Sequence, residues 1–315
     1  MKQTFPIMQY LPLTRPRACQ YFLNKLSRNG VHCALDLEDS AQDPFDLEKT
    51  KTLKQEARRG LLQISDTFKD PLQTKIYIRV NSIDTEYFEE DIDAVIQSIN
   101  NGMPITGIIL PKVEHYKNVE TVREICVSNN VDLEIIPIVE TSNGYKNLSQ
   151  VLDSDKDSNL ISKVQYGHFD YCLDSNLWPF PDPNHIEFWD IIKPMIKVIS
   201  DHGKVYLHTP FPFPNNSELF WSSTIYLSNL MPKLDFWATT LNHDLSLSEF
   251  PENPSDLKPS FMIKDHELLI EKARNISDSY YKGRANKRSF GVSSTRFIPP
   301  HQVLAAMKFL ARIDK

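Results

Sequence analysis

The sequence predicts an α/β fold, a (β/α)8 TIM barrel, from two observations. Apolar segments typical of buried parallel strands are centred near residues 9, 35, 78, 110, 137, 167, 207 and 296. All intervals between them but the last suit one strand, one helix and two loops, the repeat of a parallel barrel. Five of the segments also end in charged or polar residues, as expected where barrel strands carry a functional site.

The elements between and after the strands follow the same logic. Apolar residues recur at helical spacing over 88–99 and 187–200, and a last helix is expected over 302–312. The last interval is much longer, so we expect an insertion between strands 7 and 8, with a divergent, partly helical region over 215–290. This region also contains a short segment of strand character at 235–240. No linker separates two domains, so residues 1–315 are expected to form one domain.

Composition excludes several classes of protein. The chain has 315 residues, of which 41% are hydrophobic and 24% charged, and these values are typical of a globular protein. No apolar run approaches the roughly 20 residues of a membrane span. The net charge of −6 argues against binding to nucleic acid, which needs a basic face. Without a secretion signal or CxxC spacing among the four cysteines, we expect a cytoplasmic protein with free thiols.

Two carboxylates indicate a metal site. Glu140 and Asp170 each follow an apolar strand, and adjacent strands would bring them close enough to share a Mg²⁺ ion. The alternative is an ion-paired rim of the barrel. Arg79, at the end of the third strand, is a natural partner for an anionic substrate, because a guanidinium binds a carboxylate bidentately. Its alternative is a structural pair with Asp36 or Glu38.

Side chains on the second strand are expected to support this arginine. Asp36 and Glu38 share parity and therefore face the same way, where they would orient Arg79 and water around the metal. Asp39 is a candidate cap for the turn that follows.

Four more residues are candidates for contact with a substrate. Asn81 and Lys112 leave the third and fourth strands, and His208 leaves the seventh, where it is the leading candidate for a general base. Arg15 follows the first strand. The alternative for His208 is a structural histidine, and the alternative for Arg15 is a plain surface arginine.

The chain resembles a known superfamily, that of citrate lyase beta chains, malyl-CoA lyases and HpcH/HpaI aldolases. The resemblance covers about residues 6–175 and returns at 297–303, which is similar to the family's closing His-Pro-x-Gln strand with its order changed. It rests on five motifs in the family's order: ALDLEDS (34–40), RVNS (79–82), ILPKVE (109–114), IVETSNG (138–144) and GHFD (167–170).

This resemblance implies a Mg²⁺-dependent carbon–carbon lyase or aldolase that acts through an enolate on an oxo acid, a hydroxy acid or an acyl-CoA. It implies Glu140 and Asp170 as metal ligands, Arg79 as the strand-3 arginine, and Arg15 near the ligand. It also implies a homo-oligomer, a trimer or hexamer. The alternatives are a metal-enolate enzyme on a non-CoA substrate in a biosynthetic pathway, and a catalytically silent binding barrel.

The C-terminal part departs from the resemblance. Family lyases that split acyl-CoA continue into a segment with an aspartate that acts in a neighbouring subunit. The sequence ends at Lys315, about one helix after Gln302. We therefore expect that acid–base residue to be absent, and cleavage of CoA thioesters to be slow.

Overall fold

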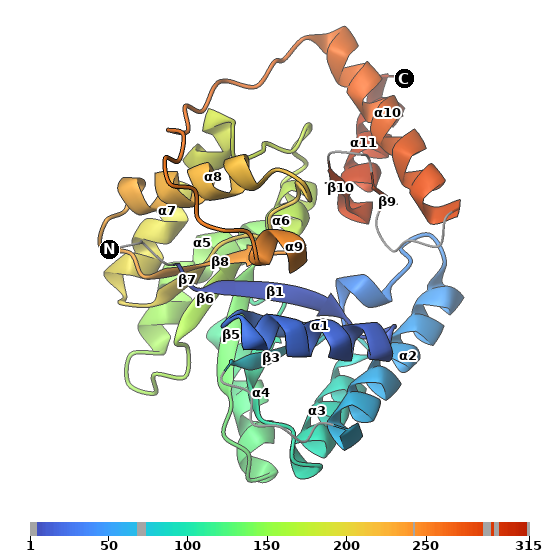
Figure 1. The fold of residues 1–315 in the computed structure, drawn as a ribbon, viewed down its shortest axis with the longest axis vertical. Coiled ribbons are helices and arrows are strands. Elements are labelled where there is room, and N and C mark those ends of the chain that lie inside the picture. Colours follow the sequence, from blue (N-terminus) through green and yellow to red (C-terminus); the bar gives the residue numbers. More distant parts are fainter. Residues whose placement is uncertain (1–4, 68–73, 242, 286–290, 293–295, 314–315) are drawn as a thin grey trace.

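The computed structural model describes residues 5–67, 74–241, 243–285, 291–292 and 296–313. Eight parallel strands form a closed barrel, in which each strand pairs with the next and β8 pairs with β1 (Figure 1). The predicted (β/α)8 barrel is confirmed. The strands are β1 (Ile7–Pro12), β2 (His32–Asp36), β3 (Ile76–Arg79), β4 (Ile105–Leu110), β5 (Glu134–Val139), β6 (Lys163–Tyr166), β7 (Val205–Leu207) and β8 (Phe236–Thr240).

Helices connect successive strands and cover the outside of the barrel. The predicted helices over 88–99 and 187–200 are confirmed as α3 and α7. In chain order these helices are α1 (Pro16–Arg28), α2 (Leu47–Thr67), α3 (Phe88–Asn100), α4 (Tyr116–Ser128), α5 (Ser142–Ser154), the short α6 (His168–Asp174), α7 (Ile186–Asp201) and α8 (Ser217–Leu230).

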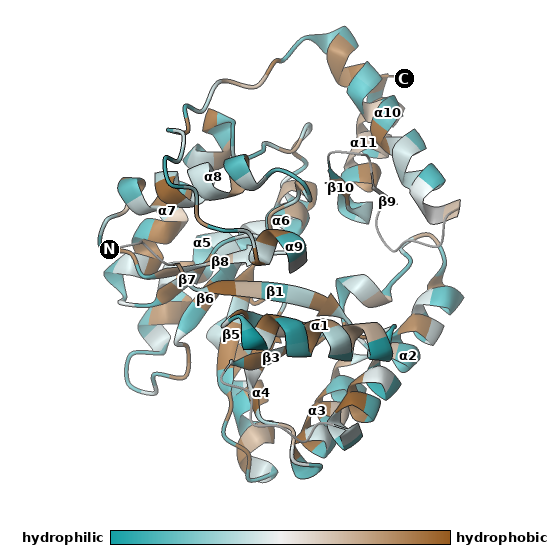
Figure 2. Ribbon diagram, in the orientation of Figure 1, coloured by the Kyte–Doolittle hydropathy of each residue, from teal (hydrophilic) through white to brown (hydrophobic). Residues whose placement is uncertain are grey.

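Alternation along the strands separates two apolar cores. One set of strand residues points into the barrel, where Tyr10, Tyr77, Ile138 and Leu207 pack together. The other set packs beneath the helices. The helices match this arrangement: α1 buries Cys19, Leu23 and Leu26, and Figure 2 shows hydrophilic residues on its outward side.

The eighth strand is the main correction to the predicted fold. It is Phe236–Thr240, which pairs with β1 and β7 and so closes the barrel. Residues near 296 instead form β10 (Phe297–Ile298), which pairs antiparallel with β9 (Gly291–Val292) outside the barrel. The helix α8 supplies the ordinary connection between β7 and β8. The additional residues therefore follow the barrel and do not interrupt it; 286–290 lie outside the described residues.

Residues after β8 form a helical layer at one end of the barrel. Beyond the short α9 (His243–Ser246), an extended segment leads to α10 (His266–Ala285), and α11 (Pro300–Ile313) packs against α10. We call α10, β10 and α11 the C-terminal cap. It lies beside α6 and the start of α2 (Figure 1), and Trp178 and Phe45 contact its aromatic residues Phe309 and Tyr280.

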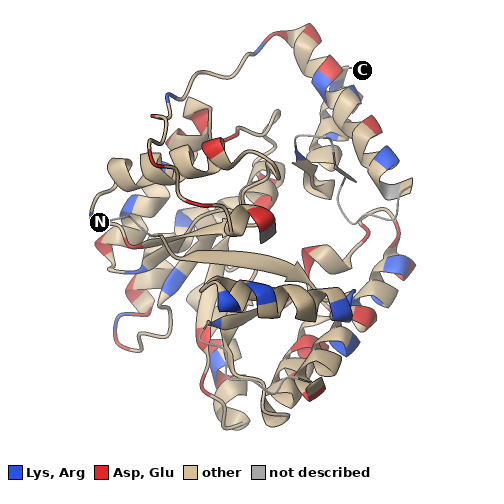
Figure 3. Cartoon of the chain, viewed as in Figure 1, with Lys and Arg blue, Asp and Glu red and all other residues tan. Residues whose placement is uncertain are grey.

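Charges of both signs are mixed on the surface. Figure 3 shows acidic and basic residues interspersed along α2 and α10. In the part of the chain that is described, we find no helix with the length and apolar character that crossing a bilayer requires.

Gly60 gives a test of the packing between α2 and the barrel. A Cβ atom at this position would lie 2.2 Å from the carbonyl oxygen of Leu13. We therefore expect Gly60→Ala to lower the free energy of unfolding by about 1–3 kcal/mol, although alanine favours helix. Urea denaturation measures this, with the exposed Gln63→Ala in the same helix as a control expected to change little. Unchanged or higher stability of Gly60→Ala would contradict this packing.

Candidate active site

A buried arginine organises one side of the barrel mouth. Arg79 Nε and Nη2 each donate to an Asp36 carboxylate oxygen at 2.7 Å. Its Nη1 donates to Asp39 Oδ2 at 2.9 Å and lies 3.1 Å from Glu38 Oε2, although not in hydrogen-bonding orientation. Three carboxylates from one short segment therefore fix the guanidinium. Asp36 and Glu38 both contact Arg79, and their role in orienting it for a substrate stays a prediction.

These contacts shift the pKa values of the cluster. Burial opposes the charge on Arg79, but its carboxylate partners raise its pKa well above the ordinary value. Burial would also raise the pKa of Asp36, yet the guanidinium lowers it. For Glu38 burial dominates, helped by repulsion from Asp39, and its pKa rises to about 8.

The face of this arginine rests on an aromatic ring. The Arg79 guanidinium carbon lies 4.8 Å from the centre of the Tyr10 ring. The Tyr10 hydroxyl donates to Gln165 Oε1 at 2.6 Å, which fixes the ring. Stacking and bidentate pairing together leave the arginine little rotational freedom.

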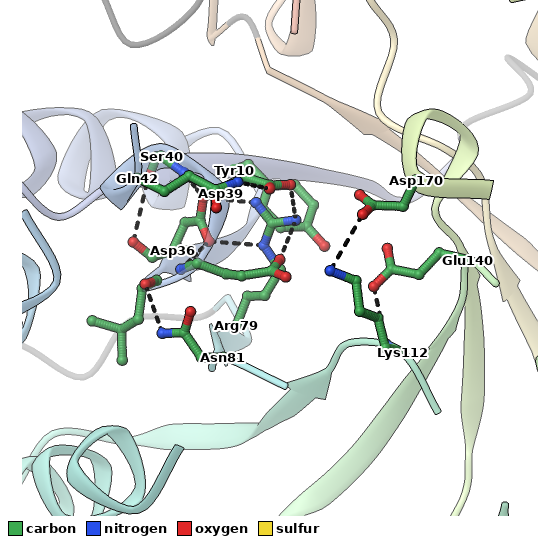
Figure 4. Close-up of polar contacts among 12 residues, drawn as sticks. Tyr10, Asp36, Asp39, Ser40, Gln42, Arg79, Asn81, Lys112, Glu140 and Asp170 are labelled. Carbon is green, nitrogen blue, oxygen red and sulfur yellow. Dashed lines mark hydrogen bonds and ion pairs between the residues drawn. The ribbon is translucent and has the colours of Figure 1, made fainter. Parts of the chain in front are cut away.

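Two further carboxylates lie across the mouth and are linked by Lys112. The Lys112 backbone N–H donates to Glu140 Oε1 at 3.0 Å, and its Nζ lies 3.4 Å from Asp170 Oδ1 (Figure 4). Lys112 adopts a left-handed conformation with φ 53°, which turns its side chain into the barrel mouth. One residue therefore contacts both carboxylates predicted as metal ligands.

The pKa values of these two carboxylates shift in opposite directions. Burial raises the pKa of Glu140 well above its ordinary value, and repulsion from Asp170 adds to this. Burial would likewise raise the pKa of Asp170, but His301 and Lys112 lower it below the ordinary range. Close approach of Glu140 to the next strand depends on Gly167, where a Cβ atom would lie 2.2 Å from Glu140 Oε2.

The C-terminal cap adds a histidine to the mouth. His301, in the first turn of α11, places Nε2 3.1 Å from Asp170 Oδ2 and 3.7 Å from Asp39 Oδ1. Burial alone would lower the pKa of His301, but Asp170 raises it to about 9. His301 therefore joins the two halves of the site.

These groups surround one small cavity with a volume of about 40 Å³, which has room for a few water molecules. Its lining combines charged groups with an apolar rim from Ile138, Pro210 and Leu241. The polar residues that line it are Tyr10, Asp39, Arg79, Glu140, Gln165, His168, Asp170, Thr209 and His301.

Among the predicted residues, Asp36, Glu38 and Lys112 contact residues that line this cavity, and three others lie away from it. Asn81 donates to Leu37 O and Asp91, and so holds β3 against α3. Arg15 is exposed just before α1.

His208 is the third. Leu207 points into the barrel, so His208 points outward, between the barrel and α7, where it stacks on Trp189 and bonds Tyr206. Burial lowers the pKa of His208 to about 3. The candidates for proton transfer are therefore the groups that line the cavity.

Four other residues of the cavity are harder to recognise from the sequence. Tyr10, Gln165 and Thr209 share the inward parity of their strands, but none has a charge that would single it out. His301 lies in the 297–303 motif, yet its position in the cavity depends on the folded cap.

The donor set of the mouth fits a divalent cation. Glu140 is buried, Asp170 is largely buried, and repulsion between the two disfavours the charge on Glu140. A cation between them would relieve this repulsion, and carboxylate oxygens are the protein ligands that Mg²⁺ prefers.

Comparison with known proteins agrees with this description. A family model for HpcH/HpaI aldolase/citrate lyase matches residues 33–204, more than half of the chain. The chain belongs to this family. The predicted resemblance is thereby confirmed, and the family supports a lyase or aldolase type of enzyme. No curated protein matches the chain in sequence.

Solved structures that resemble this family member share its fold. Malate synthase from Haloferax volcanii, as a ternary complex with pyruvate and acetyl-CoA, has a TM-score of 0.70 and 14% identity, and the match covers 99% of this chain and 92% of that chain. The citrate lyase beta subunit from M. tuberculosis, complexed with oxaloacetate and magnesium, has a TM-score of 0.55 and 16% identity. This match covers 78% of this chain and 97% of that chain. RipC from Yersinia pestis has a TM-score of 0.56 and 17% identity, and the match covers 77% of this chain and 92% of that chain.

Proposed function

We propose that this protein is a Mg²⁺-dependent carbon–carbon lyase or aldolase of the citrate lyase beta-chain type, acting on a small oxo acid or hydroxy acid through an enolate. The observation that carries the proposal is the shared cavity: the fixed guanidinium of Arg79 faces the same enclosed space as Glu140 and Asp170. The magnesium-bound and oxo-acid-bound state of the M. tuberculosis protein of the same fold supports it.

Residues in and beside the cavity would have different roles in the reaction. Glu140 and Asp170 would hold the cation, which when bound polarises a substrate carbonyl. Arg79 would stabilise negative charge that develops on a substrate oxygen, because its position is already fixed and needs no rearrangement during reaction. Lys112, placed beside Asp170, would bind a substrate carboxylate.

Cavity size favours a small substrate. The volume of about 40 Å³ and the position of Pro299 and His301 of the cap leave room for small molecules only. A condensation or cleavage that uses a CoA thioester is the second candidate, supported by the match to malate synthase over 99% of this chain. It requires the cap to move away from the mouth.

Hydrogen exchange at the substrate tests the proposal. With Mg²⁺ in deuterated buffer, we expect the methyl group of pyruvate to exchange its protons, because formation of an enolate removes one of them reversibly. Proton NMR follows the loss of the methyl signal, and chelation of the metal by EDTA should stop it. No exchange above the protein-free rate, for either pyruvate or oxaloacetate, would leave a silent binding barrel as the better interpretation.

A further inference from the structure

Three potential metal ligands converge at the mouth from distant parts of the chain. Asp39 follows β2, Asp170 lies on α6, and His301 lies on α11 of the cap. One ligand atom from each lies within 4.8 Å of the other two. His301 Nε2 lies 3.1 Å from Asp170 Oδ2.

The two separations that involve His301 are those expected around a single metal ion. With bonds of about 2.0–2.2 Å, two ligand atoms of one ion lie about 3 Å apart when adjacent and about 4 Å apart when opposite. The separation of 3.7 Å between His301 Nε2 and Asp39 Oδ1 also falls in this range.

The neighbouring cations leave the facing oxygens accessible. Arg79 bonds Oδ2 of Asp39, and Lys112 contacts Oδ1 of Asp170. His301 faces the other oxygen of each carboxylate. Asp39 Oδ1 also accepts from Gln42 at 2.6 Å, which orients that carboxylate and leaves it a second lone pair.

An unpaired hydroxyl in the same cavity is independent evidence for a ligand. Thr209 is only 4% exposed, has the inward parity of β7, and its Oγ1 has no hydrogen-bond partner among the described residues. Leaving a buried hydroxyl unpaired costs about 1–3 kcal/mol. A water molecule or substrate oxygen on a bound ion would satisfy it.

We propose that Asp39, Asp170 and His301 form a divalent-metal site with both oxygen and nitrogen donors. The site rests on the proposed function only in sharing Asp170 with the Glu140 and Asp170 pair. An imidazole ligand favours Mn²⁺, Co²⁺ or Zn²⁺ over Mg²⁺, which prefers oxygen ligands and retained water.

The site would also join the cap to the barrel. Asp39 and Asp170 belong to the barrel mouth, whereas His301 belongs to the cap. A bound ion would therefore hold α11 over the cavity, and release of the ion would free the cap to open.

Electron paramagnetic resonance of bound Mn²⁺ tests the site. In the parent protein, we expect electron spin-echo modulation from a coordinated ¹⁴N nucleus, and tighter binding of Mn²⁺ than of Mg²⁺ in competition. His301→Gln should remove the ¹⁴N coupling and raise the Mn²⁺ dissociation constant by about 10- to 100-fold, while changing that for Mg²⁺ by less than about 3-fold. His266→Gln, an exposed histidine on the same cap, is the matched control and should retain the parent signal.

A second measurement needs no variant. Mn²⁺ should slow amide hydrogen exchange in α11, because the ion bridges it to the barrel, and Mg²⁺ should have a smaller effect. If Mn²⁺ binds without ¹⁴N coupling, or without protecting the amides of α11, the proposed site is overturned. Methyl exchange of pyruvate could still proceed in that case, so the proposed function would stand. Coupling without any methyl exchange would support the site and count against the proposed reaction instead.

Discussion

Replacing Glu140 with glutamine is expected to reduce Mg²⁺-dependent exchange of pyruvate by at least about 10²- to 10³-fold, a loss comparable to removal of a principal electrostatic group from an active site. Glutamine preserves the size of the side chain and its ability to accept from the Lys112 backbone. It removes the negative charge that would hold the cation against Asp170. The expected defect is therefore in Mg²⁺ binding, and calorimetric titration with Mg²⁺ would show it directly.

Stability separates this effect from misfolding. Glu140 is buried, and burial and Asp170 both disfavour its charge. Without metal, Glu140→Gln should therefore be as stable as the parent or more stable. The matched control is Glu114→Gln, a strand-end carboxylate that bonds Thr141 and does not line the cavity. It should keep exchange within about 3-fold. Parental Mg²⁺ affinity in Glu140→Gln would exclude Glu140 as a ligand.

The sequence predicted most of the barrel because buried parallel strands are continuous apolar runs. The strand β8 was harder to recognise, since Phe236–Thr240 is short and ends in alanine and two threonines. Its identity depends on pairing with β1, a contact between the two ends of the barrel. The motif at 297–303 drew the prediction away from it, although that segment lies in the cap.

Residues of the candidate site could be predicted from the sequence where a charged side chain directly follows an apolar strand. Arg79, Glu140 and Asp170 were found in this way, and all three line one cavity. The orientation of His208 was not predictable, because a shift of one residue in the assigned strand moves a side chain to the other face.

Lys112 and His301 show two further limits of sequence reasoning. The side chain of Lys112 reaches Asp170 through a left-handed backbone conformation that its residue type does not indicate. His301 enters the cavity only because α11 packs against α10 and α6. Both positions depend on tertiary structure.

Arg79→Lys is expected to lower turnover by about 10²- to 10³-fold while the protein remains folded. Lysine keeps the positive charge but has one nitrogen, which cannot bond both Asp36 oxygens and still face Glu38 and Asp39. It also loses the planar contact with Tyr10. Because the guanidinium is fixed before reaction, the loss should lie in kcat more than in KM, as expected for a group that acts in the transition state.

Arg58→Lys provides the matched control for this change. Arg58 is also buried and pairs with Asp91 and Glu90, but it lies between α2 and α3, away from the cavity. Both variants disturb a buried ion pair, so we expect a loss of stability of about 1–3 kcal/mol in each. Only Arg79→Lys should lose turnover, because Arg79 lines the cavity and Arg58 does not. Equal turnover in the two variants, within a few-fold of the parent, would make Arg79 a structural residue, since its carboxylate partners would then be its whole role.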